Sequence, residues 1–290
     1  MVLFLKLILG SLTCFFSLFY FFDVFKGKLK VAKKKWASLL GIGFITNFFD
    51  TLGIGSFAQQ TALFKFFKLV NDRLIPGTMN VGNTIPTVLQ AFIFMNVFRV
   101  EPLTLASISL AAPVGAVLGA GYVAKMSKRL IQIGLGSGLF LVALFIIAGF
   151  TGLVPSGGTA LGISGVKLIA ITIMSFIFGA LQSIGIGFYA PCMAMVYAMG
   201  LHPSTAFPIM MTATGLLMAA GGARFIKEKA YNREAALSAT IAGIAGVFLA
   251  AFVVKSMSLS LLKIVVLVVV VYTSVTMFAE AVRNKPDSER

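Results

Sequence analysis

Apolar segments, most of them close to the length of about 20 residues that a helix needs to cross a bilayer, recur along the whole chain and constrain its fold most. Charged residues make up only 11% of the 290 positions, whereas a soluble domain carries about 25%. A transmembrane β-barrel would instead show short strands of alternating polarity, which this sequence lacks. The sequence therefore predicts an all-α polytopic membrane protein.

The formal net charge of +15 comes from Lys and Arg residues that stand between the apolar segments. In that position they orient a membrane protein, because short basic loops stay in the cytoplasm, and they do not indicate nucleic-acid binding. Cys14 and Cys192 both lie inside apolar stretches and show no metal-type spacing. No metal, cofactor or enzymatic constellation is predicted. The first apolar segment has no basic leader and no small-residue cleavage site, so a retained helix is favoured over a signal peptide.

The chain divides into five regions. Residues 1–35 contain an N-terminal transmembrane helix and a basic loop, and residues 36–150 contain an apolar block broken by glycines and then three ordinary spans. An uncharged linker rich in Gly, Ser and Thr covers 151–166. Residues 167–283 repeat the broken block and the three spans, and 284–290 form a short tail.

The two broken blocks are similar in sequence. NFFDTLGIGSFA (Asn47 to Ala58) aligns with GALQSIGIGFYA (Gly179 to Ala190), so that Gly53-Ile54-Gly55 falls on Gly185-Ile186-Gly187. After a shortened loop Pro76-Gly77-Thr78 aligns with Pro203-Ser204-Thr205, and Met126-Ser127 aligns with Met257-Ser258. A broken block followed by three spans, twice in the same order, predicts an internal repeat.

Charge sets the orientation of the two repeats. If each Gly-Ile-Gly block is a re-entrant hairpin, the basic loops and the C-terminus all lie in the cytoplasm and the N-terminus outside, at the plasma membrane. If each block crosses once, two basic loops face outside. The hairpin gives each repeat three crossings, an odd number, so the prediction is two inverted repeats preceded by one extra helix. Such architectures are frequent in secondary transporters, with the site near the midplane.

Each Gly-x-Gly tip would open a half-helix whose first N–H groups lack partners, which favours a small anion. Neighbouring polar residues and a polar run after the first hairpin complete the predicted site. The predicted substrate-binding residues are Gly53, Gly55, Ser56, Gln59, Asn80, Asn83, Thr84, Gly185, Gly187, Tyr189, Cys192 and Thr212. Packing of close helices is the alternative role of the glycines, and interhelical hydrogen bonding is the alternative role of the polar run.

Asp50 is the one acidic residue deep in a predicted span, and its counterpart in the second repeat is the neutral Gln182. A carboxylate at membrane depth is costly and is a functional hypothesis by default. Asp50 is therefore predicted to carry a coupling proton or cation. A structural carboxyl group satisfied by its neighbours is the alternative.

FFDTLGIGSF and GALQSIGIGFYAPCMAMVYAMG resemble the sulfite exporter TauE/SafE family of membrane permeases, over roughly Trp36 to Ala279. Many members carry a triple glycine at the first tip, where this chain has Leu52-Gly53-Ile54-Gly55. The resemblance implies a permease for sulfite or a related sulfur-containing or organic anion. The expectation is a secondary transporter that alternates access around the tips. An anion channel and a non-transporting membrane assembly protein are the alternatives.

Overall fold

The computed structural model describes residues 1–27, 33–53, 55–71, 74–123, 158–182, 187–255 and 259–283, with single helical residues between 133 and 147. The basic loop at 125–129, most of the span 130–150, the first half of the linker, Gly185 and the tail lie outside the described residues. The helices are α1 (Val2–Lys26), α2 (Lys33–Thr51), α3 (Phe57–Phe66), α4 (Ile75–Val97), α5 (Pro102–Val123), α7 (Gly165–Gln182), α8 (Tyr189–Ala198), η2 (Pro203–Thr205), α9 (Ala206–Lys227), α10 (Arg233–Lys255) and α11 (Leu259–Arg283). Within these ranges the only strand-like pairing is one bridge between Ala160 and Leu201. The all-α prediction is confirmed for this part of the chain.

Within the described residues, four helical stretches are long and apolar enough to cross a membrane: Val2–Lys26, Gly165–Gln182, Pro203–Lys227 and Arg233–Val253. Their outer faces carry large apolar side chains in contact with the surroundings, such as Phe4 on α1, Ile169 on α7 and Phe252 on α10. A soluble protein rarely exposes so much contiguous apolar surface. Length, composition and exposed surface thus agree with the prediction of a helical membrane protein.

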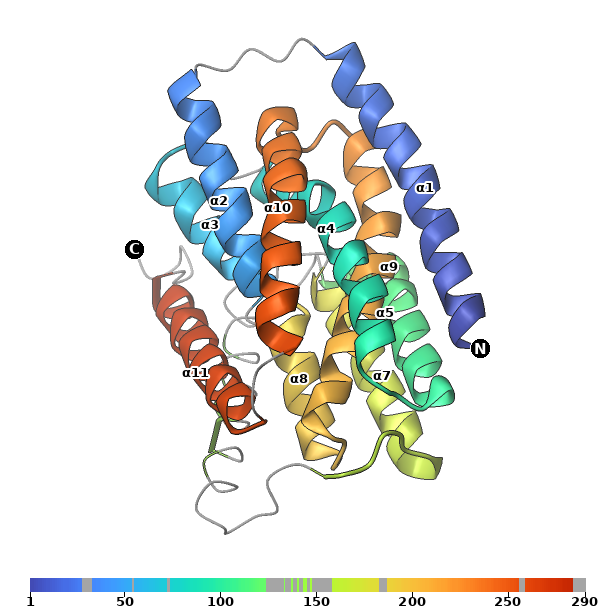
Figure 1. Ribbon diagram of the computed structural model, residues 1–290. Helices are drawn as coiled ribbons and strands as arrows, with labels where there is room; N and C mark the ends of the chain where they lie inside the picture. The colour runs from blue at the N-terminus through green and yellow to red at the C-terminus, as the bar shows by residue number, and fades with distance from the viewer. Residues whose placement is uncertain are drawn as a thin grey trace.

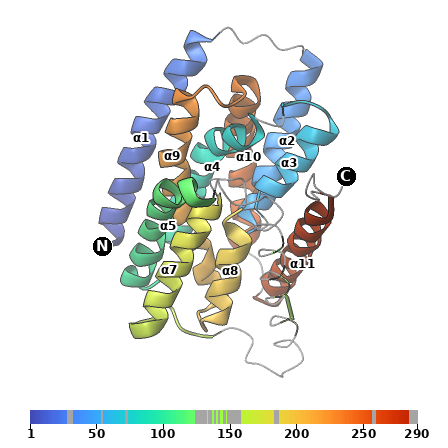
Figure 2. The same ribbon diagram turned by 180° about the vertical axis from the view of Figure 1, so that it is seen from behind.

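Both glycine-containing blocks are broken helices. The first breaks between α2 and α3, where Gly53 and Gly55 have φ angles of +92° and +76°. Glycine adopts such angles without the steric cost that a side chain brings. The second break separates α7 from α8. In Figures 1 and 2, α2 starts at the end of the molecule where α1 finishes, and α7 starts at the opposite end. We call the described residues of 52–56 the first tip, and Gly187 and Phe188, the described residues directly before α8, the second tip.

Most contacts between long helices join the two halves of the chain. The main pairs are α2 with α10, α5 with α7, and α4 with α9. Glycines allow close approach: a Cβ on Gly115 of α5 would overlap the carbonyl of Phe176 on α7, and one on Gly246 of α10 would meet the carbonyl of Phe44 on α2. The core between these helices contains α9, of which most residues are buried.

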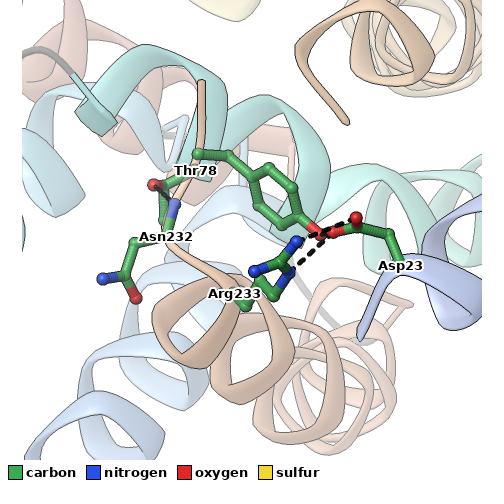
Figure 3. A network of polar contacts seen from close by, with 5 residues as sticks. Asp23, Thr78, Asn232 and Arg233 are labelled. Carbon is green, nitrogen blue, oxygen red and sulfur yellow. Dashed lines mark hydrogen bonds and ion pairs between the residues drawn. The ribbon is translucent and has the colours of Figure 1, made fainter. Parts of the chain in front are cut away.

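Helix α1 lies along α9 and is fixed to the other helices by polar contacts at one end (Figure 3). Asp23 accepts two hydrogen bonds from the Arg233 guanidinium, at 2.8 and 2.9 Å, and a third from the Tyr231 hydroxyl at 2.5 Å. Next to this group, the backbone N–H of Asn232 donates to the Thr78 hydroxyl of α4 at 2.9 Å. The loop between α9 and α10 is therefore held by both α1 and α4.

Candidate functional site

The two tips face each other across a small cavity of about 20 Å³. We call it the tip cavity. Its lining comes from both tips, from the adjoining ends of α2, α3, α7 and α8, and from α4 and α9: Asp50, Gly55, Ser56, Phe57, Thr87, Gln182, Gly187, Phe188, Tyr189, Thr214 and Met218. A space of this size holds one or two water-sized groups. The tip cavity is therefore suited to a small ion and not to a large metabolite.

Asp50 lies at the end of α2, is only 3% exposed, and is the one acidic or basic side chain among the described residues that line the tip cavity. Its Oδ1 accepts from the backbone N–H of Ser56 at 2.5 Å, and its Oδ2 accepts from Gln90 Nε2 at 3.0 Å. Gln90 Oε1 accepts in turn from the Tyr189 hydroxyl at 2.7 Å. This chain of hydrogen bonds joins the first tip to α4 and to α8 in the second half of the chain.

On the opposite side of the tip cavity, polar groups have no partner. Gln182 at the end of α7 is 1% exposed, and neither Nε2 nor Oε1 of its amide makes a hydrogen bond. The Thr214 hydroxyl on α9 is likewise buried without a partner. Leaving a buried polar group unsatisfied costs about 1–3 kcal/mol. These groups are therefore available to a bound ion or to water.

The structure brings together five of the residues that the sequence predicts for the site: Asp50, Gly55, Ser56, Gly187 and Tyr189 line the tip cavity. Gly55 and Gly187 stand close to the opposite tip, because a Cβ on Gly55 would lie 3.8 Å from that of Tyr189, and one on Gly187 would lie 3.9 Å from that of Phe57. Gly185 lies outside the described residues.

Other predicted residues lie away from the tip cavity. The Asn80 amide donates to the Pro76 carbonyl and the Thr84 hydroxyl to the Asn80 carbonyl, so both bond within α4. Gln59 bonds to the Gly55 carbonyl at 3.0 Å, one turn before it in the chain. Three more lie outside the lining: Gly53, which faces Met193, and Cys192 and Thr212, which are fully buried.

Asn83 belongs to a second polar group, which is buried between α2, α3 and α4. Asn83 and Gln60 exchange two amide hydrogen bonds of 2.8 and 2.9 Å, and Asn47 donates to Asn83 at 3.0 Å. Gln60 also donates to the Thr46 hydroxyl at 2.8 Å. Because their donors and acceptors bond mainly to one another, these amides hold the first hairpin against α4 rather than facing the tip cavity.

Thr87, Gln182 and Thr214 line the tip cavity, and Gln90 donates to Asp50 beside it, but none of the four was among the predicted binding residues. The alignment of the two halves could have identified three of them. Gln182 is the aligned counterpart of Asp50, and Thr214 is that of Thr87 when Pro76 is aligned with Pro203. Gln90 offered no such signal, since its counterpart is Leu217.

The lining suits a small ion that accepts hydrogen bonds. It offers the Gln182 amide, the Thr214 hydroxyl and the start of α8, and no group of three or more His, Cys, Asp or Glu residues that could hold a metal occurs in the described part of the chain.

Searches of protein-family models, curated proteins and solved structures found no match to this chain.

Proposed function

We propose that this chain is a secondary membrane transporter of the sulfite-exporter kind, which moves sulfite or a related small anion through the tip cavity. Its two halves are inverted repeats, each a re-entrant hairpin and three transmembrane helices, with α1 added in front. The basic loops and the C-terminus lie in the cytoplasm, by the positive-inside rule. The observation that carries the proposal is the composition of the tip cavity, which both halves form together.

The lining of the tip cavity supports the repeat. Ten of its eleven described residues form five aligned pairs, one member from each half: Asp50 with Gln182, Gly55 with Gly187, Ser56 with Phe188, Phe57 with Tyr189, and Thr87 with Thr214. Reciprocal contacts follow the same alignment. Gly55 faces Tyr189, the counterpart of Phe57, and Gly187 faces Phe57, so each glycine faces the counterpart of the residue two positions after it.

The packing of the long helices gives independent support. The close contact of Gly115 with Phe176 is matched by that of Gly246 with Phe44, and both residues of one pair are the aligned counterparts of the other pair. Gly215 contacts Val88, which is its own counterpart, as expected for residues beside a pseudo-two-fold axis. A site on such an axis between inverted hairpins is the arrangement that transporters use for substrate.

An anion is favoured over a cation because helices α3 and α8 begin at the tip cavity. The N–H groups and the partial positive charge at a helix start attract anions. Asp50 adds a negative charge to the same space, so the transported anion is accompanied by a proton on Asp50 or by a cation. The proposal is therefore coupled transport, with Asp50 as the coupling group.

A thermal-shift screen of the purified protein tests the proposal. The panel is sulfite, thiosulfate, sulfate, sulfonates and carboxylates, with matched chloride salt as the control. A ligand at about one hundred times its Kd stabilises the folded state by about 2.7 kcal/mol, which raises the melting temperature by roughly 4–5 °C in a chain of this size. We expect such a shift for sulfite or another small member of the panel. A folded protein that none of these anions stabilises contradicts the proposal.

A further inference from the structure

The further inference concerns the unequal halves of the tip cavity, and it rests on the proposed anion transport. We infer that in the empty site the Asp50 carboxylate is a built-in anion that occupies the first tip, and that the ligand binds at the corresponding place at the second tip, against Gln182, Thr214 and the start of α8, as Asp50 takes up a proton or a cation. One anion is then bound per molecule, although two tips of the same design meet at the cavity.

At the first tip, the chain supplies its own negative group. Asp50 Oδ1 accepts from the N–H of Ser56 at 2.5 Å, and Ser56 directly precedes α3. A side-chain carboxylate that accepts from an N–H group at a helix start is stabilised by the helix dipole. Gln90 satisfies the second oxygen at 3.0 Å. The Ser56 N–H group, which an external anion would need as a donor at this tip, already donates to Asp50.

The second tip has no acidic side chain at the position that corresponds to Asp50. Gln182 takes the place of Asp50, carries no charge, and leaves both ends of its amide unpaired while 1% exposed. Phe188 precedes α8 where Ser56 precedes α3, and it makes no side-chain capping hydrogen bond. The Thr214 hydroxyl is a further unpaired donor at the same cavity. An uncapped helix start beside unpaired buried donors is a site that an external anion completes.

The chemistry of the second tip defines the ligand class. The Gln182 Nε2 group and the Thr214 hydroxyl can each donate a hydrogen bond, and the start of α8 favours negative charge. A cavity of about 20 Å³ limits the ligand to a few non-hydrogen atoms. The ligand is therefore a small anion with at least two oxygen acceptors, one for each of these donors. Sulfite and formate both meet this description.

The first test fills the second tip with a carboxylate. Gln182→Asp places a negative group where Asp50 stands in the other half, and Gln182→Asn is the matched control of the same size without charge. Sulfite and formate binding is measured by thermal shift and by isothermal titration at mildly alkaline pH. We expect Gln182→Asp to weaken binding at least a hundredfold, and Gln182→Asn to weaken it no more than tenfold.

The second test empties the first tip. Asp50→Gly removes the built-in anion, and Asp50→Asn keeps an oxygen that accepts from Ser56. We expect formate to stabilise Asp50→Gly at concentrations beyond those that saturate the wild type, with two formate ions bound per molecule, while Asp50→Asn still binds one. If Asp50→Gly does not fold, the two Gln182 variants alone test the inference.

The outcomes separate this inference from the proposed function. Wild-type affinity in a folded Gln182→Asp variant overturns the inference, because the ligand then lies elsewhere, yet anion binding itself stands. A wild-type protein that binds none of the tested anions removes the proposed function and this inference together. Equal losses in Gln182→Asp and Gln182→Asn also overturn the inference, since the effect then depends on side-chain length and not on charge.

Discussion

Asp50 and Gln182 stand at corresponding positions at the ends of α2 and α7 and line one cavity, yet their surroundings differ. Both carboxylate oxygens of Asp50 accept hydrogen bonds, from Ser56 and Gln90, whereas neither end of the Gln182 amide has a partner. The two sides of the cavity therefore differ in hydrogen bonding: the carboxylate has its partners, and the amide has none. This difference leads to predictions about charge, space and orientation at the tips.

Asp50→Asn is expected to retain anion binding and to lose most of its pH dependence. Two negative charges about 6 Å apart repel by about 3 kcal/mol at an effective dielectric constant of about 20. The wild type therefore binds an anion more tightly when Asp50 carries a proton, and its affinity falls as pH rises. The variant has no charge to neutralise. The measurement is the Kd for formate, which stays ionised at neutral and alkaline pH, and this Kd must change little with pH for Asp50→Asn. A folded variant with the wild-type slope would show that Asp50 is not the coupling group.

Gly187→Val is expected to abolish anion binding while the protein stays folded. Gly187 lines the tip cavity and does not have a positive φ, and the nearest atom to an added Cβ is 3.9 Å away, so a side chain fits the backbone but fills the space.

Gly53→Ala should instead lower the melting temperature, because its φ is +92° and the new Cβ would lie 2.6 Å from Met193 Cε. Gly41→Ala, with open space around it, is the control for both. Normal affinity in Gly187→Val would place the ligand outside the tip cavity.

The sequence was sufficient to predict the helix breaks and the long apolar spans, because glycine pairs and segment length are local properties. It was not sufficient to predict which polar residues reach the tip cavity. Asn83 has the helical spacing of a cavity-facing residue, but the rotation of α4 turns it toward Gln60 and Asn47. Thr214 rather than Thr212 lines the cavity for the same reason, since packing of α9 on α4 selects the face.

Asp23→Ala is expected to destabilise the protein without changing anion affinity. The Asp23 carboxylate is largely buried and accepts three hydrogen bonds, two from Arg233 and one from Tyr231. Hydrogen bonds that involve a charged group contribute about 1.5–3 kcal/mol each at most, and less with partial exposure, so a fall of several degrees in melting temperature is predicted. Glu228→Ala is the control, because its ion pair with Arg224 is exposed. Equal melting temperatures for the two variants would mean that α1 is not held by Asp23.

Single cysteines test the proposed orientation of the hairpins. In a background without Cys14 and Cys192, cysteines at Lys68 and Lys227 should react with an impermeant thiol reagent only from the cytoplasm, because basic loops stay inside. A cysteine at Leu161, which is 43% exposed before α7, should react only from outside. Labelling of the Lys68 position from outside would mean that the first broken helix crosses the membrane, and the repeats would not be inverted.

Counterflow in proteoliposomes tests the central claim most directly. Liposomes that contain the purified protein and unlabelled sulfite are diluted into radiolabelled sulfite, and uptake is compared with that of liposomes carrying Gly187→Val and of protein-free liposomes. The account predicts saturable uptake that internal sulfite accelerates, and uptake by Gly187→Val no faster than by protein-free liposomes. Uptake that neither saturates nor responds to internal sulfite, or that Gly187→Val leaves unchanged, would contradict transport by alternating access at the tip cavity.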